Sequence, residues 1–156
     1  MRPEVTEWVR GIVAEYRPQP VVLEVGSRNI NGSVRPLFPK PYKGLDMEPG
    51  PGVDVVDDIL TVEGLEGFNT VVCCETLEHI TEPWTAIERM YAALDPGGLV
   101  ILTTVFSFPI HECPEDFWRF TPDGLRYLLE RAGFYEIRID SQGEGPVGVF
   151  AVGRKP

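Results

Sequence analysis

Val22-Leu23-Glu24-Val25-Gly26-Ser27-Arg28-Asn29-Ile30-Asn31-Gly32 is the most informative stretch of this sequence. A short apolar run containing one acid, Glu24, leads directly into a glycine and then into a polar loop. This pattern is typical of a buried strand that turns sharply at its carboxyl end, and Gly26 lets the backbone turn and lets a ligand approach it closely. In open α/β sheets, ligands bind at that edge. Because Arg28 occupies the second glycine position of Gly-x-Gly-x-x-Gly, the stretch lacks the dinucleotide fingerprint, and on its own it fits an ordinary strand-turn equally well.

Similar apolar runs recur along the chain, separated by turn residues. Most are continuously apolar, which is typical of strands buried on both faces of a largely parallel sheet. We predict strands at Val21–Val25, Tyr42–Asp46, Val53–Val56, Thr70–Cys74, Leu99–Val105, Tyr135–Asp140 and Val147–Val152.

Three segments between these runs carry apolar residues at helical spacing, with capping residues at their ends. Prolines at 39 and 41 limit any helix after the first strand to a turn or two. The predicted helices are Glu4–Tyr16 within an N-terminal segment 1–18, a second from the N-cap Thr81 to before Gly97-Gly98, and a third from Thr121-Pro122 to Gly133.

The alternation of strands and helices predicts a single α/β domain over residues 1–156, with helices on both faces of a mostly parallel sheet. Only Ser141–Pro146 joins the last two strands. That connection is too short for a crossover, so these strands are expected to form an antiparallel hairpin.

The composition narrows the class of protein. The chain has 156 residues, 43% of them hydrophobic, and a net charge of −10, which is typical of one globular domain and argues against nucleic acid or an anionic membrane as the main partner. No signal-peptide h-region is visible, so we expect a cytoplasmic protein. Cys73, Cys74 and Cys113 make a poor disulfide framework, and the absence of Cys-x-x-Cys and His-x-x-x-His spacing argues against a metal site.

Two further strand ends carry acids. Asp46 closes its strand 22 residues after Glu24, where an acid binds ribose hydroxyls in nucleoside-binding α/β folds. Asp57 and Asp58 follow the third strand, and a carboxylate there can accept from the exocyclic amine of adenine, with Ile59 against the ring. The alternatives are that Asp46 starts a turn and that the later acids cap a helix or stay solvated.

Phe68–His79 and Leu94–Leu102 together predict a strand, a polar loop, a helix, a Pro-Gly-Gly turn and a long apolar strand. With the preceding motifs, their order and spacing resemble the class I S-adenosylmethionine-dependent methyltransferases, in particular the small type 11 group. The resemblance covers residues 20–105 by motif and the rest by topology. It implies a Rossmann-like sheet of seven strands with the last strand antiparallel, and S-adenosylmethionine as the cofactor.

The resemblance also assigns cofactor-binding residues by position. Near the methionine part of the cofactor it places Glu24, Gly26 and Ser27; at the ribose and adenine it places Asp46, Met47, Asp58 (Asp57 is the alternative) and Ile59; and beside the sulfonium it places Cys74 and Glu75. An acidic sheet edge suits a cationic sulfonium. His79 matches the histidine of a Leu-Glu-His motif, and we expect a structural role for it near the start of a helix.

The aromatic-rich segment 106–120 follows the fifth strand, so we expect it to cover the cofactor and form the acceptor pocket. His111 is the candidate general base because imidazole titrates near neutral pH, and the alternative is a loop histidine bonded to backbone. Phe108, Trp118 and Arg119 are candidate acceptor-binding residues.

Each of these last assignments has an alternative in which the residue only shapes the segment. Arg119 either holds an anionic acceptor or pairs with Asp116 or Glu115, and the aromatic rings either contact the acceptor or pack the segment itself.

The function expected from the resemblance is methyl transfer from S-adenosylmethionine to a small-molecule or glycan-type acceptor by in-line displacement. A nicotinamide-linked oxidoreductase domain fits less well because the three-glycine fingerprint is missing. A non-catalytic cofactor-binding or partner-subunit module with the same fold is the alternative. The hairpin edge or the aromatic segment can pair with a second chain, which makes a homodimer possible.

Overall fold

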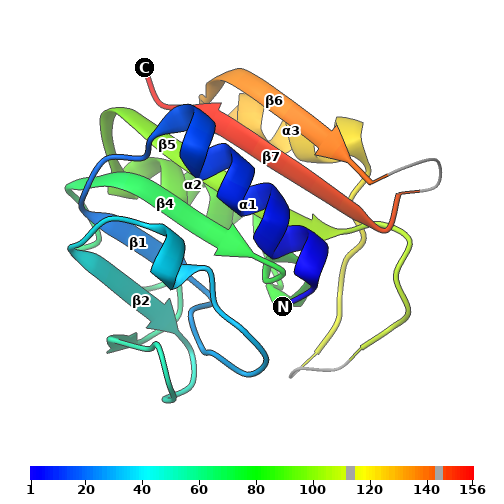
Figure 1. Ribbon diagram of the computed structural model, residues 1–156, viewed down its shortest axis with the longest axis horizontal. Coiled ribbons are helices and arrows are strands. Elements are labelled where there is room, and N and C mark those ends of the chain that lie inside the picture. Colours follow the sequence, from blue (N-terminus) through cyan, green and yellow to red (C-terminus); the bar gives the residue numbers. More distant parts are fainter. Residues whose placement is uncertain (112–114, 143–145) are drawn as a thin grey trace.

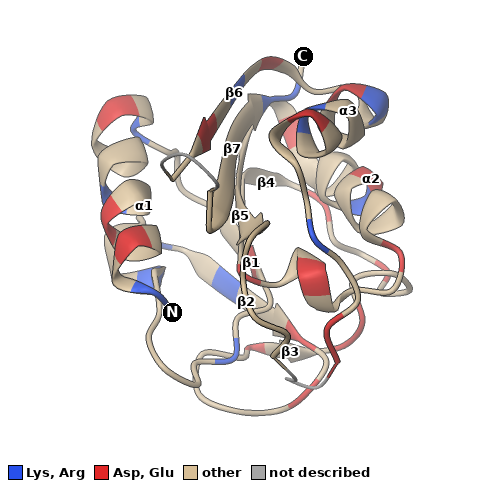
Figure 2. Ribbon diagram, turned by 90° about the vertical axis from the view of Figure 1, so that its right-hand side faces the viewer, with Lys and Arg blue, Asp and Glu red and all other residues tan. Residues whose placement is uncertain are grey.

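The computed structural model describes residues 1–111, 115–142 and 146–156. One seven-stranded sheet with the order β3-β2-β1-β4-β5-β7-β6 forms its centre. Helix α1 covers one face, and α2 and α3 cover the other (Figures 1 and 2). The elements are α1 Pro3–Tyr16, β1 Val22–Val25, η1 Arg35–Leu37, β2 Tyr42–Asp46, β3 Val55–Val56, β4 Phe68–Cys74, η2 Leu77–His79, α2 Pro83–Ala93, β5 Leu94–Val105, α3 Pro122–Ala132, β6 Tyr135–Ser141 and β7 Gly148–Arg154.

The strand order confirms the predicted fold class. Strands β1 to β5 pair in parallel. β7 is antiparallel to β6, as the short connection between them requires, and it is also antiparallel to β5. The chain runs outward from β1 to β3 and then returns to place β4 on the other side of β1. The carboxyl ends of β1 and β4 therefore flank the point where the direction of winding reverses, which is where such sheets bind ligands.

Two hydrophobic cores lie on the two faces of the sheet. The first packs α1 against the sheet through Val5, Val9 and Ile12, and the second packs α2 and α3 against the opposite face. Cys73 belongs to the core on the α2 side and Cys74 to the core on the α1 side, so the two lie on alternate faces of β4. The third cysteine, Cys113, lies outside the described residues.

The predicted helix limits are correct at α3 and wrong at α2. Thr121 caps α3 by accepting a hydrogen bond from the backbone N–H of Gly124 at 3.0 Å, and Gly133 ends the helix at a φ of 104°. Thr81, in contrast, is not the N-cap of α2. That position belongs to Glu82, because Pro83 has the fixed φ and the missing N–H that suit the first helical position.

Other limits differ by a few residues. β3 has two residues, fewer than predicted, and β5 already begins at Leu94, where it pairs with Phe68 before an irregularity in the register. The predicted Pro-Gly-Gly turn therefore lies inside β5. As expected from the prolines, only the short η1 follows β1. Within the described ranges, no helix combines the length and the apolar character needed to span a bilayer.

Candidate cofactor and acceptor site

The loops after β1 and β4 meet at the reversal point of the sheet. Gly26 follows β1 with a φ of 77°, in the left-handed region that favours glycine. A Cβ at this position would lie 2.1 Å from Oγ1 of Thr76, in the loop after β4. Only glycine lets these two loops approach each other so closely, so the sequence motif has a direct steric reason.

Asp46 is held at the carboxyl end of β2 by the loop after β1. Its Oδ2 accepts the backbone N–H of Arg28 at 3.0 Å, and its Oδ1 accepts the backbone N–H of Glu48 at 3.1 Å. Gly26 and Ser27 donate their backbone N–H groups to the carbonyl of Leu45. Because a carboxylate oxygen can accept more than one hydrogen bond, Asp46 keeps acceptor capacity for two hydroxyl groups while its position is fixed.

Buried polar atoms without partners lie beside this loop. Glu24 is 4% exposed, and burial raises the pKa of its carboxyl group to about 7 against the lowering effect of the nearby Tyr42 hydroxyl. Glu24 Oε2, Ser27 Oγ and the Tyr42 hydroxyl make no hydrogen bond to any described residue. Such atoms are rare in folded proteins unless water or a ligand bonds to them. The residues assigned to the methionine part of the cofactor thus fit a polar ligand.

The residues assigned to adenine follow two neighbouring strands: Met47 follows β2, and the two acids and Ile59 follow β3. Asp57 Oδ1 accepts the backbone N–H of Asp58 at 2.8 Å, and Asp58 Oδ1 accepts that of Leu60 at 2.9 Å. Met47 is 66% exposed, which leaves an apolar side chain free for a ring to lie against, whereas Ile59 is buried in the core. The adenine contacts stay predictions. Helix capping by the two acids is wrong, because the described residues between β3 and β4 form a turn and no helix.

Glu75 at the end of β4 pairs with an arginine that the sequence analysis missed. Its two carboxylate oxygens accept from Arg2 Nε at 2.9 Å and from Arg2 Nη2 at 3.1 Å, and both side chains are 17% exposed. The N-terminus of α1 therefore lies at the carboxyl edge of the sheet (Figure 1). Cys74, just before Glu75, is buried, and burial raises the pKa of its thiol. Its place beside the sulfonium stays a prediction.

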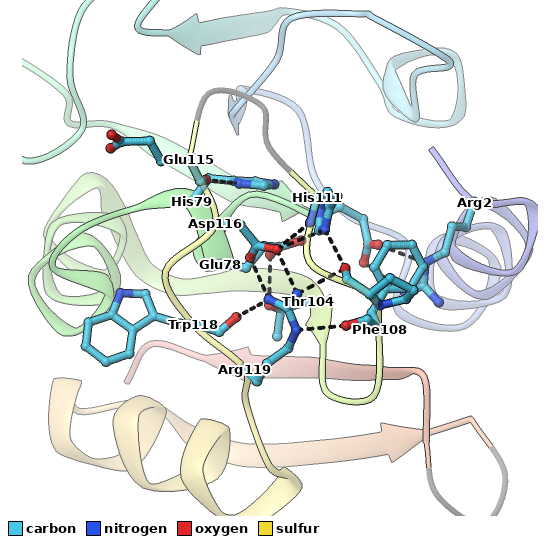
Figure 3. A network of polar contacts seen from close by, with 12 residues as sticks. Arg2, Glu78, His79, Thr104, Phe108, His111, Glu115, Asp116, Trp118 and Arg119 are labelled. Carbon is cyan, nitrogen blue, oxygen red and sulfur yellow. Dashed lines mark hydrogen bonds and ion pairs between the residues drawn. The ribbon is translucent and has the colours of Figure 1, made fainter.

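The segment after β5 is organised by Asp116. Its carboxylate accepts two hydrogen bonds from the Arg119 guanidinium, at 2.5 and 2.7 Å, and one from the His111 backbone N–H at 2.8 Å. The Arg119 guanidinium holds the pKa of Asp116 well below its usual range. Arg119 also donates to the carbonyls of Phe108 and Pro109 (Figure 3). Of the two roles left open for Arg119, the structure shows the pairing with Asp116.

The predicted aromatic contacts mainly shape the segment. The Trp118 indole donates to the carbonyl of Ile80 at 2.9 Å and packs edge-on against Trp84. The Phe108 ring lies under the Arg2 guanidinium, 5.5 Å from its central carbon, and 5.0 Å from the His111 ring centre. Phe108 thus joins His111 to the N-terminal segment, while Trp118 packs against the start of α2. Their contacts with an acceptor stay predictions.

Glu78 and His79 of η2 lie beside His111 (Figure 3). Glu78 is fully buried and accepts from Thr104 Oγ1 at 2.9 Å. The ring centres of His79 and His111 are 4.8 Å apart. The sequence analysis expected only a structural role for His79, since its proximity to His111 depends on the path of the segment after β5. Leu77-Glu78-His79, an acid and an imidazole next to each other at a strand end, was the available signal.

No family model matches the chain. The ubiquinone biosynthesis O-methyltransferase of Pseudomonas entomophila (strain L48) is 38% identical over 63 residues, which is 37% of this chain and 27% of that protein. The match therefore spans little more than a quarter of the relative's length.

Two solved structures match nearly the whole fold. One is the 1,6-didemethyltoxoflavin-N1-methyltransferase of Burkholderia thailandensis, solved with 1,6-didemethyltoxoflavin and S-adenosylhomocysteine bound. It superposes with a TM-score of 0.75 at 15% identity, and the match covers 97% of this chain and 78% of that protein's chain. The other is the N-terminal domain of EvdMO1 with S-adenosylhomocysteine bound. Its TM-score is 0.75 at 19% identity, and the match covers 100% of this chain and 83% of that domain's chain. This chain has the class I S-adenosylmethionine-dependent methyltransferase fold.

Proposed function

We propose that this protein transfers a methyl group from S-adenosylmethionine to a small-molecule or glycan-type acceptor. The observation that carries the proposal is Asp46, fixed at the end of β2 by the loop after β1 and placed next to the reversal point of a class I methyltransferase sheet. The unpartnered buried atoms of Glu24 and Ser27 beside the same loop support a polar ligand there. We also propose the small type 11 group, on the motifs around Leu77-Glu78-His79 and Asp95-Pro96-Gly97-Gly98.

In this proposal, Asp46 binds the ribose hydroxyls and the acidic sheet edge attracts the sulfonium cation. A lone pair of the acceptor forms a bond to the methyl carbon while the carbon–sulfur bond breaks. The electron pair of that bond goes to sulfur and gives S-adenosylhomocysteine. Most of the acceleration comes from aligning the three atoms and from excluding water, which is the role we assign to the segment after β5.

We assign His111 as the base that takes the acceptor's proton. Its Nδ1 lies 3.2 Å from Asp116 Oδ2, and the Arg119 guanidinium fixes that carboxylate from the other side. With the Nδ1 proton directed at Asp116, the Nε2 lone pair is free to accept a proton. Asp116 is then a positioning residue. The cytoplasmic location and the homodimer expected from the sequence both stay predictions.

Isothermal titration with S-adenosylmethionine tests cofactor binding, and release of S-adenosylhomocysteine with a panel of hydroxyl, amine and sugar acceptors tests turnover. Asp46→Asn should abolish binding, whereas the matched control Asp95→Asn, at an exposed position of β5, should bind as wild type does. Binding that is equal in both variants contradicts the assigned site. Binding without turnover on any acceptor favours the non-catalytic module.

A further inference from the structure

We propose that Glu78, His79 and His111 form a binding site for a divalent transition-metal cation of the Zn²⁺ type. One potential ligand atom from each of the three side chains lies within 4.8 Å of the others. Glu78 and His79 come from η2, and His111 comes from the segment after β5, so the fold brings together donors that no short sequence spacing reveals. Figure 3 shows the three side chains facing one another.

The Glu78 carboxylate lacks a partner that a cation would provide. It is fully buried, its Oε2 accepts from Thr104, and its Oε1 makes no hydrogen bond to any described residue. Burial, together with the charges of Glu75 and Asp116, raises the pKa of Glu78 to about 7. The nearby cation, Arg119, already pairs with Asp116. An unpaired buried carboxylate is costly, and metal coordination is one of the few arrangements that offset this cost.

Both imidazoles present a lone pair away from the backbone. His79 Nδ1 contacts the carbonyl of Glu115, and His111 Nδ1 lies 3.2 Å from Asp116 Oδ2 and 3.3 Å from the carbonyl of Pro109. Because these partners are all acceptors, each Nδ1 carries the proton and each Nε2 keeps its lone pair. Metal-ligating histidines are held in this way, with the second ring N–H bonded to a carboxylate or carbonyl. Thr104 similarly orients the carboxylate of Glu78.

The donor set identifies the class of cation. Two imidazoles and one carboxylate are ligands of three-residue Zn²⁺ sites that keep a fourth position open, whereas Mg²⁺ and Ca²⁺ prefer oxygen ligands. Tetrahedral Zn²⁺ at its usual bond lengths places ligand atoms about 3.4 Å apart. Rotation of the side chains is therefore needed to close the cluster on the ion. In the metal-bound form, His111 is a ligand and no longer serves as the base assigned above. The open position can then bind an acceptor oxygen and make its proton more acidic, a role that rests on the proposed function.

The test is titration of the chelator-treated 156-residue protein with Zn²⁺, measured by calorimetry, and with Co²⁺, measured by its visible absorption. A control carboxylate is available in Glu115, whose side chain points away from the cluster (Figure 3). Cys113 is a second control, because a thiol can bind Zn²⁺ on its own. The variants are Glu78→Gln, His79→Ala, His111→Ala, Glu115→Gln and Cys113→Ser.

We expect one Zn²⁺ per chain and a four-coordinate Co²⁺ spectrum, retained in Glu115→Gln and Cys113→Ser. Each of the three ligand variants should bind Zn²⁺ about 100-fold more weakly or worse, since even residues behind the ligands are worth 10–100-fold. The proposal is overturned if wild type binds no stoichiometric Zn²⁺, if the ligand variants bind as wild type does, or if Cys113→Ser alone abolishes binding.

S-adenosylmethionine binding, measured in parallel, separates this proposal from the proposed function. A ligand variant that loses Zn²⁺ but keeps S-adenosylmethionine binding is folded, so its metal result supports the site. If either histidine variant fails to fold, Glu78→Gln, the most conservative of the three substitutions, decides the test. Protein that binds Zn²⁺ but not S-adenosylmethionine supports the metal site and contradicts the proposed function.

Discussion

Replacing Glu78 with glutamine should change how the stability of the metal-free protein depends on pH. The carboxyl group is fully buried, and burial raises its pKa from 4.5 to about 7, with Glu75 and Asp116 acting in the same direction and Thr104 opposing them. The folded state therefore holds a proton that the unfolded state releases between these two pH values. The neutral Glu78 side chain makes its full contribution to folding stability below pH 4.5. That contribution is lost as the pH rises through about 7.

The magnitude follows from the shift. One pKa unit is worth about 1.4 kcal/mol, so ionised Glu78 destabilises the fold by about 3 kcal/mol at pH 8 and by less than about 1 kcal/mol at pH 5. Burying the glutamine amide has a cost of its own, but that cost is the same at both pH values. The stability of Glu78→Gln relative to wild type should thus increase by about 2 kcal/mol from pH 5 to pH 8, or about 4–8 °C in Tm.

The assay is thermal or urea unfolding of both proteins in chelator at pH 5 and pH 8. Glu66→Gln is the matched control, because Glu66 is exposed and its substitution should give the same difference at both pH values. Glu24, whose pKa is raised in the same way, contributes equally to wild type and variant and cancels in the comparison. A difference between Glu78→Gln and wild type that does not grow with pH refutes the reasoning.

Three further predictions concern single contacts. Thr121→Ala removes the cap of α3 and should lower stability by about 1 kcal/mol, or about 2–4 °C in Tm by calorimetry, and an unchanged Tm contradicts the cap. Gly26→Ala places a Cβ 2.1 Å from Oγ1 of Thr76 at a φ of 77°, so it should abolish S-adenosylmethionine binding in titrations; wild-type affinity argues against the close approach. Asp116→Asn leaves the Arg119 guanidinium without its charged partner and should destabilise the protein by about 2 kcal/mol at pH 7 in urea. That loss should disappear in acid, since the lowered pKa of Asp116 makes its contribution fall only as the pH drops below the ordinary aspartate range.

The fold could be predicted because its signals are local. Continuous apolar runs, the Gly26 turn and the six-residue link Ser141–Pro146 each constrain the backbone over a few residues, and together they define the sheet. The predicted N-cap of α2 was wrong by one residue. Thr81 has a side chain suited to capping, but Pro83 fixes where the helix begins and makes Glu82 the N-cap. Local patterns place elements well and their ends less well.

The candidate site was predictable only in part. Asp46 and Gly26 lie at strand ends, so their position at the sheet edge follows from the sequence. The pair between Arg2 and Glu75 joins residues 73 positions apart, and the approach of Glu78 to His111 depends on how the segment after β5 returns across the sheet. Such contacts are set by tertiary packing, which spacing along the chain does not report.

The most direct test of the central claim is thermal unfolding of the protein with S-adenosylmethionine, with S-adenosylhomocysteine and with NAD. At a ligand concentration 100 times its Kd, binding to the folded state adds about 2.7 kcal/mol, which raises Tm by about 5–10 °C for a domain of this size. We predict such a rise with both adenosyl ligands, none with NAD, and none with any ligand after Asp46→Asn. No rise with either adenosyl ligand at millimolar concentration contradicts the assignment of the sheet edge as a cofactor site.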